Sequence, residues 1–136
     1  GRSLRIVNRL KRENIKTNMT CLMMTNQVLL AAKAGATYAS IFFNRVRDSG
    51  GDVQGVIRES RTIIDKGSFA TKIIVGSIRK PEDVNEAAVA GAHILTVPYK
   101  ILVQMPYHWK TEDTIREFDQ AWQEFKQAEG RIAASS

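Results

Sequence analysis

The stretch TKIIVGSIRKPEDVNEAAVAGAHILTVP, residues 71–98, decides the fold. It opens with the β-branched run Lys72–Val75, which is typical of a strand buried on both faces. Pro81 stands where a helix can begin, because its missing N–H costs nothing at the first helical position, and Gly91 suits a helix end. The apolar run His93–Pro98 follows. The stretch therefore predicts a β–α–β unit with parallel neighbouring strands, because such crossovers are right-handed.

The same pattern occurs twice. The segment AAVAGA at 87–92 echoes AAKAGA at 31–36, and each precedes an apolar strand. Small residues let a helix end pack closely on a sheet, and glycine supplies the left-handed turn. Two such units in the same phase indicate a repeated β/α architecture.

Helices and strands are expected to alternate along the whole chain. Periodicity predicts strands at 17–24, 36–43, 72–75 and 93–98, and helices at 3–14, 25–34, 53–66, 81–90, 99–105 and 111–130. Residues 44–52 are a loop by composition. This is an α/β fold with four parallel strands, and the alternative is a small doubly wound sheet. Ser77, Arg79 and Lys80 lie at a carboxyl strand end, where α/β folds place their sites.

Composition allows one domain with a real core, since 43% of the 136 residues are hydrophobic. The formal charge is +6, and the first segment carries much of the excess. A basic face can bind nucleic acid, but no recognition motif accompanies it, so we expect no nucleic-acid partner. The other two interpretations are a solvated helix face and attraction for small anions such as phosphorylated metabolites.

The single cysteine, Cys21, cannot form an internal disulfide, which fits a reducing, cytoplasmic compartment. We interpret it as a small core residue, because neither His93 nor His108 is placed near it. The histidines lack metal-ligand spacing, so no metal or cofactor is expected. No apolar run is long enough for a membrane span. The initial Gly1 suggests a processed or cloned fragment.

The last predicted helix has apolar residues spaced three, four and three apart: Ile115, Phe118, Trp122 and Phe125. Such a stripe must be buried. The chain's own body or a neighbouring subunit can cover it.

Several segments then carry a family resemblance: Thr20–Met23 followed by Asn26–Ala36, Phe43–Arg45 with the Gly50–Gly51 loop, Gly76–Pro81, Ala90–Ala92, Thr96–Pro98 ahead of Met105, and Phe118–Trp122. In this order and spacing, they resemble the small transaldolases and fructose-6-phosphate aldolases over nearly the whole chain. The resemblance implies a TIM barrel of which this chain matches strands five to eight. We therefore expect a (β/α) half-barrel at 1–110 and a C-terminal helical extension at 111–136 that packs on a neighbouring subunit.

The family transfers a dihydroxyacetone unit through a Schiff-base lysine, which the resemblance places on strand four, outside this sequence. The acidic residue and the Thr/Asn pair of the first two strands are also outside it. Lys16 and Lys72 lie at amino strand ends, the stability face. Lys100 lies near a carboxyl end, but at a helix start where a solvated lysine is expected.

Three residues match the substrate-holding side of the family's site. The resemblance makes Thr20 the threonine that positions the catalytic water, and Arg45 and Ser77 the phosphate-binding pair. The chemistry agrees, because a guanidinium is a planar fork for phosphate and Ser77 precedes a helix N-terminus that favours anions. Arg45 can instead be a surface arginine, and Thr20 can serve packing alone.

Three further residues are expected to line the pocket. Ser40 and Phe42 match the small and aromatic positions of strand six. In the aldolase branch the Phe42 position is a tyrosine that assists proton transfer, so its replacement favours the transaldolase branch. Met23 stands where an aromatic is common on strand five.

A half-barrel leaves its inner face uncovered. We expect that face to be formed by residues from the following group: Cys21, Met23, Ile41, Phe43, Val75 and Leu95. Such a face is an association site, which predicts a homo-oligomer formed through the open face and the last helix.

Three hypotheses remain open. The first is the C-terminal half of a transaldolase-like enzyme of sugar-phosphate (pentose phosphate) metabolism, inactive without the lysine strand. The second is a phosphate-binding, self-associating half-barrel without catalysis. The third is a basic nucleic-acid-binding module.

Overall fold

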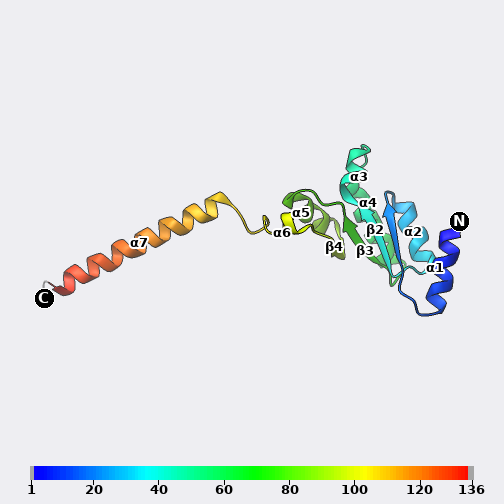
Figure 1. Ribbon diagram of the computed structural model, residues 1–136, viewed down its shortest axis with the longest axis horizontal. Coiled ribbons are helices and arrows are strands. Elements are labelled where there is room, and N and C mark those ends of the chain that lie inside the picture. The colour runs from blue at the N-terminus through cyan, green and yellow to red at the C-terminus, as the bar shows by residue number, and fades with distance from the viewer. Residues whose placement is uncertain (1, 135–136) are drawn as a thin grey trace. The chain divides into compact units, whose positions relative to one another are not determined.

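The computed structural model describes residues 2–134 and contains one four-stranded sheet (Figure 1). The strands are β1 (Asn18–Leu22), β2 (Tyr38–Phe42), β3 (Lys72–Gly76) and β4 (Ile94–Leu95). They lie side by side in this order, and every neighbouring pair is parallel. The helices are α1 (Arg2–Arg12), α2 (Thr25–Ala34), α3 (Phe43–Asp48), α4 (Val53–Lys66), α5 (Pro81–Ala90), α6 (Tyr99–Leu102) and α7 (Trp109–Ala134). The predicted class, parallel strands alternating with helices and followed by a C-terminal helix, is confirmed.

The chain divides into two compact units, Gly1–Leu102 and Val103–Ser136. The first contains the sheet with α1 to α6, and the second contains α7. The predicted apolar stripe of α7 is more than half exposed at every position: Ile115, Phe118, Trp122 and Phe125. Its docking on a neighbouring subunit stays a prediction. None of the described helices combines the length and apolar character that crossing a membrane requires.

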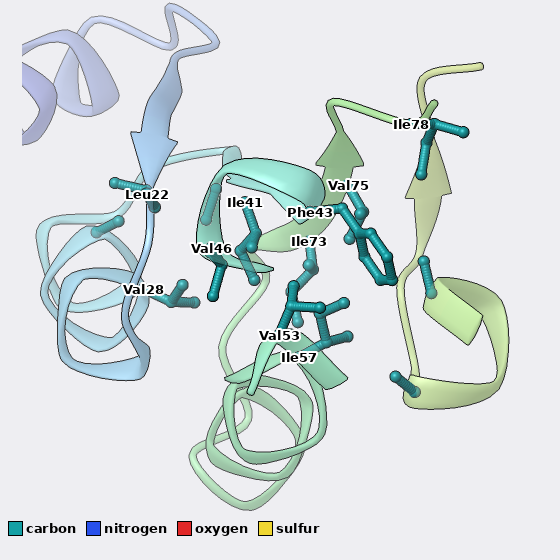
Figure 2. Packing of buried hydrophobic residues seen from close by; sticks show 14 of the residues in the cluster. Leu22, Val28, Ile41, Phe43, Val46, Val53, Ile57, Ile73, Val75 and Ile78 are labelled. Atoms are coloured by element: carbon teal, nitrogen blue, oxygen red, sulfur yellow. The ribbon is translucent and has the colours of Figure 1, made fainter. Parts of the chain in front are cut away.

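The core of the first unit lies between one face of the sheet and its helices. Strand side chains alternate between two faces, and those on the helix side are completely buried: Ala39, Ile41, Ile73 and Val75. Figure 2 shows Val53 and Ile57 pointing from α4 toward Ile73. Val28 of α2 and Ala87 of α5 belong to the same cluster.

The expectation about the inner face is wrong for three residues, since Ile41, Phe43 and Val75 have no exposed surface and belong to the helix-side core. Met23 and Leu95 also pack against that core. For Ile41 and Val75 the physical reason is the two-residue period of a strand, in which an error of one position exchanges the faces. Phe43 is instead the first residue of α3. The open face of β2 and β3 instead carries Tyr38, Ser40, Phe42 and Ile74.

Turn chemistry is confirmed at both repeats, where Gly35 and Gly91 end α2 and α5 with φ of 85° and 109°. Helix α4 has the predicted bounds, and the Asp52 carboxylate caps it by accepting a hydrogen bond from the amide of Gly55 at 2.9 Å.

The predicted loop at 44–52 is wrong in its first half, because α3 begins at Phe43. This six-residue helix is too short to be stable alone. Its buried side chains, Phe43, Asn44 and Val46, tie it to the rest of the unit. The second strand of the opening stretch is also shorter than predicted, at two residues.

Candidate functional site

The candidate site lies at the carboxyl ends of β2 and β3. Phe42 pairs with Gly76 at the end of these strands. Beyond them, the amide of Asn44 in α3 donates to the carbonyl of Ser77 at 3.3 Å. This contact brings the helix that carries Arg45 to the residue that follows β3. Two of the predicted site residues therefore share one edge of the sheet.

Ser77 adopts a left-handed backbone conformation, with φ of 63°. Its carbonyl also accepts a hydrogen bond from Nδ2 of Asn44 at 2.8 Å. Within the described residues, no hydrogen bond engages its hydroxyl. The following helix begins at Pro81 with Glu82 and Asp83 in its first turn. A strained, half-buried serine just before a helix N-terminus is a suitable donor for an anion.

The Arg45 side chain is exposed, and its guanidinium lies over the ring of Phe42, 5.6 Å from the ring centre. This cation–π contact holds the side chain at the strand end. Among the described residues it forms no hydrogen bond or ion pair, so its donors stay available for a ligand.

A second guanidinium, that of Arg79, stands beside this edge. Asp48 at the end of α3 accepts hydrogen bonds from both of its terminal nitrogens, at 3.0 and 2.7 Å. These hydrogen bonds lower the pKa of the Asp48 carboxyl and raise the pKa of Arg79. Both side chains are 55% exposed, so the pair contributes little to stability but orients Arg79.

Sequence reasoning missed a buried polar cluster beneath the edge. It assigned Asp83 only to the start of a helix, whereas its carboxylate is completely buried and bonded to Asn44 and Arg47 of α3. Burial by itself raises the pKa of Asp83. Hydrogen bonds from the Arg79 amide, Asn44, Arg47 and the Lys80 amide outweigh it and hold that pKa below its usual value. The sequence feature that could have pointed to Asp83 is an acidic residue at the third position of a predicted helix.

The other predicted residues lie on β1, β2 and the segment after β1. Ser40 is buried, and its hydroxyl donates to Oδ1 of Asn18 at 2.8 Å. Phe42 is half-buried at the end of β2, and Met23 is half-buried after β1. Thr20 is exposed in the irregular part of β1, where the register with β2 shifts. Such bulges are common beside active sites, and the roles of all four residues stay predictions.

The three lysines considered from the sequence are all exposed: Lys16, Lys72 and Lys100. Lys72 opens β3 at its amino end, and Lys100 lies in α6. In the part of the chain that the structure describes, no group of three or more His, Cys, Asp or Glu side chains is arranged to hold a metal ion.

The parallel strands, their covering helices and a polar carboxyl edge are features of the (β/α)-barrel fold, of which this chain has four strands. The family model described as Transaldolase/Fructose-6-phosphate aldolase matches residues 2–135, and the chain belongs to this family. A protein named probable transaldolase from Carboxydothermus hydrogenoformans is 46% identical over 123 residues, 90% of this chain and 58% of that protein. One of the same name from Oceanobacillus iheyensis is 48% identical over 109 residues, 80% of this chain and 51% of that protein.

The chain thus spans a little more than half the length of these relatives. Solved structures show the same fold. A mutant flavocytochrome b2 with benzoylformate matches with a TM-score of 0.55 at 19% identity, covering 69% of this chain and 26% of that chain. A Pediococcus acidilactici lactate oxidase matches with a TM-score of 0.54 at 21% identity, covering 68% and 26%. At these identities the likeness concerns the fold alone.

Proposed function

We propose that this chain is the substrate-holding part of a transaldolase-like enzyme of sugar-phosphate metabolism. Arg45 and Ser77 hold the phosphate, and Thr20 positions the water of the Schiff-base steps. The observation that carries the proposal is the contact between α3 and Ser77, since it joins the two phosphate-binding candidates. Family membership supports it, because both residues stand in segments that carried the resemblance.

The charge of the site suits this role. Arg45 and Arg79 supply two planar guanidinium groups at one edge, and Ser77 adds a hydroxyl donor before a helix N-terminus. A phosphate dianion placed there is far better recognised than the neutral hydroxyl of a free sugar. Arg79 is held by Asp48, so it contributes mainly by its position.

The covalent step needs an amine that loses its proton readily. In the proposal, this amine attacks the ketose carbonyl, water leaves as the iminium forms, and the carbon–carbon bond then breaks to release an aldose phosphate. Lys16, Lys72 and Lys100 are exposed, which does not favour the unprotonated form. We assign the amine to the part of the family's barrel that this segment does not match. The chain alone is then inactive.

The first test is binding of fructose 6-phosphate and of fructose by calorimetry. Arg45→Met should weaken sugar-phosphate binding about 10- to 150-fold, since a hydrogen bond to a charged group contributes about 1.5–3 kcal/mol. Arg12→Met is the matched control, because Arg12 is an exposed arginine in the last turn of α1, which precedes the amino end of β1. Equal binding of the two sugars, or equal effects of the two variants, argues against a phosphate site.

The second test separates an enzyme from a non-catalytic phosphate-binding half-barrel that associates with itself. Borohydride with fructose 6-phosphate should trap no adduct on this chain. A chimera that adds the part of the Carboxydothermus hydrogenoformans relative that this chain does not match should form one. An adduct on Lys100 of the present chain contradicts our assignment, and an inactive but sugar-phosphate-binding chimera favours the non-catalytic alternative.

A further inference from the structure

The Asp83 carboxylate has more hydrogen-bond partners than a helix cap requires. It lies in the first turn of α5 and has no exposed surface. Oδ2 accepts from the amides of Arg79 at 2.9 Å and Lys80 at 3.2 Å, and from Nδ2 of Asn44 at 2.6 Å. Oδ1 accepts from Arg47 at 2.9 Å. Three donors surround Oδ2 and one contacts Oδ1, and the group has no exposed surface, so it does not bind a substrate itself.

Two of these donors belong to the loop after β3, and two belong to α3. Asn44 extends the connection, since Nδ2 donates one hydrogen to Asp83 and the other to the carbonyl of Ser77. Both hydrogens of its amide group are thereby used. Asp83, Asn44 and Ser77 form a continuous hydrogen-bonded path, and Arg45 is the residue next to Asn44 in the chain.

Arg47 fixes the other side of this cluster. One nitrogen of its guanidinium contacts Asp83, and the other donates to Glu86 at 2.6 Å. Gln54 of α4 also donates to Glu86, at 2.8 Å. The guanidinium stacks over the ring of Phe43, 4.7 Å from its centre. Helix α3 is therefore held against α5 by polar contacts as well as by its apolar side chains, and Glu86 also links α5 to α4.

Helix capping alone does not account for this arrangement. An exposed acidic residue at the third helical position can accept from the N-cap amide as well, whereas a carboxylate removed from water carries a large desolvation cost. That cost is offset only when several well-placed donors surround the charge, and here half of them come from another helix. The geometry joins two elements that each carry a phosphate-binding candidate.

We propose that Asp83 is a positioning residue that holds Ser77 and the Arg45-bearing helix α3 in the mutual arrangement that a substrate phosphate needs. This inference rests on the proposed function. Because the two elements are fixed before the ligand arrives, binding loses little conformational entropy. Serine does not favour a left-handed backbone. The hydrogen bonds that the Ser77 carbonyl accepts from Asn44 also stabilise that conformation.

The experiment compares Asp83→Asn with Glu82→Gln in the full chain. The exposed Glu82 precedes Asp83 in the same helical turn, so its variant removes an equal charge without touching the cluster. Amide hydrogen exchange is followed by NMR without ligand. Asp83→Asn should speed exchange at Arg79 and Lys80, and also at Asn44, whose amide bonds the Ser77 carbonyl. Glu82→Gln should leave all three unchanged.

The same variants are titrated with fructose 6-phosphate. Asp83→Asn should weaken its binding about tenfold, and binding of fructose should not change. Unchanged exchange at Asn44 overturns the inference, because Asp83 is then only a local cap. Faster exchange at Asn44 with full affinity also overturns it. If the wild-type chain shows no preference for the phosphorylated sugar, the proposed function fails, and exchange at Asn44 still decides whether Asp83 joins the two elements.

Arg47→Gln provides a second route in case Asp83→Asn does not fold. Arg47 is partly exposed, with 37% of its side chain accessible, so its replacement is tolerated more easily. The variant should weaken fructose 6-phosphate binding and speed exchange at Asn44, while Arg79 and Lys80 keep their protection through Asp83. Full affinity in this variant contradicts the positioning role of the connection to α3.

Discussion

Two serines flank β3, and both have a left-handed backbone. Ser68 precedes the strand with φ of 49°, and Ser77 follows it with φ of 63°. This region costs an ordinary L-residue roughly 1–2 kcal/mol. The same backbone strain has different causes at the two ends of the strand. At the amino end it belongs to a local turn, and at the carboxyl end it belongs to the candidate site.

Ser68 is left-handed because it finishes a helix. Its amide donates to Asp65 at 3.1 Å, and the next amide, that of Phe69, donates to Ile64 at 3.0 Å. These two bonds define a Schellman motif, in which the residue after the helix is left-handed. The strain at Ser68 is thus compensated within a few residues of the chain.

Ser77 ends no helix. The partner of its carbonyl, Asn44, lies 33 residues away and is oriented by the buried Asp83. Its strain is therefore maintained by tertiary contacts, and its hydroxyl stays available at the carboxyl edge. Strain held by distant contacts beside charged groups is typical of functional sites.

Thr71→Val should give the largest effect on stability. Thr71 lies at the amino end of β3, where its buried hydroxyl donates to the carbonyl of Ala36 at 2.6 Å. Valine keeps the shape but leaves this carbonyl unpaired, which costs about 1–3 kcal/mol. Urea unfolding should show this loss while fructose 6-phosphate affinity stays constant. A parallel loss of affinity shows that the two ends of the strand are not independent.

The comparison of the serines is tested directly by Ser77→Gly, with Ser68→Gly as its matched control. Each glycine relieves left-handed strain, and we expect the free energy of unfolding to rise by about 0.5–1 kcal/mol in both. Only Ser77→Gly removes a phosphate donor, so it alone should weaken fructose 6-phosphate binding, by about tenfold. Equal affinity of the two glycine variants for fructose 6-phosphate would show that Ser77 does not bind the phosphate.

Replacing His93 should have the smallest effect, which is a change in how the free energy of unfolding depends on pH. Its Nδ1 accepts a hydrogen bond from the amide of Ile73 at 3.0 Å. Burial lowers the pKa of His93, and Arg61 and Lys72 lower it further, against an opposing effect of Asp65. The folded state therefore binds this proton less readily than the unfolded chain, in which a histidine has a pKa of about 6.5.

Stability from His93 is then fully present above about pH 6.5 and is lost as the pH falls toward the lower pKa of the folded state. His93→Asn keeps an acceptor for Ile73 but does not titrate. Urea unfolding at pH 7.5 and 5.5 should show a decrease for the wild-type chain and a smaller one for the variant. Identical pH dependence in the two proteins contradicts the assignment.

Local patterns predicted much of this fold. Helix α4 has the expected bounds, and the two Ala-rich helix ends turn at Gly35 and Gly91 as expected. Arg45 and Ser77 were predicted as site residues because strand ends and a family resemblance coincide there, and the structure places both at the same edge of the sheet. These features depend on residues close in sequence, so periodicity and turn chemistry were sufficient.

Helix α3 escaped prediction because its sequence is short and polar, and distant partners such as Asp83 stabilise it. The face that Ile41 and Val75 occupy was also assigned wrongly, since an apolar strand does not show which side its helices will cover. Asn44 and Arg47 are visible in the sequence, but their partner Asp83 lies more than thirty residues away along the chain.

The sequence by itself determined the alternation of strands and helices, the turns at the repeated glycines and the polar strand end at Ser77. The reason is that propensity, capping and periodicity act within one turn or one strand. Only the tertiary structure decided that Asp83 is buried, that Asn44 bridges it to Ser77, and that α3 forms at all. Burial of a charge is set by donors brought together from different elements, and no local pattern records which elements will meet.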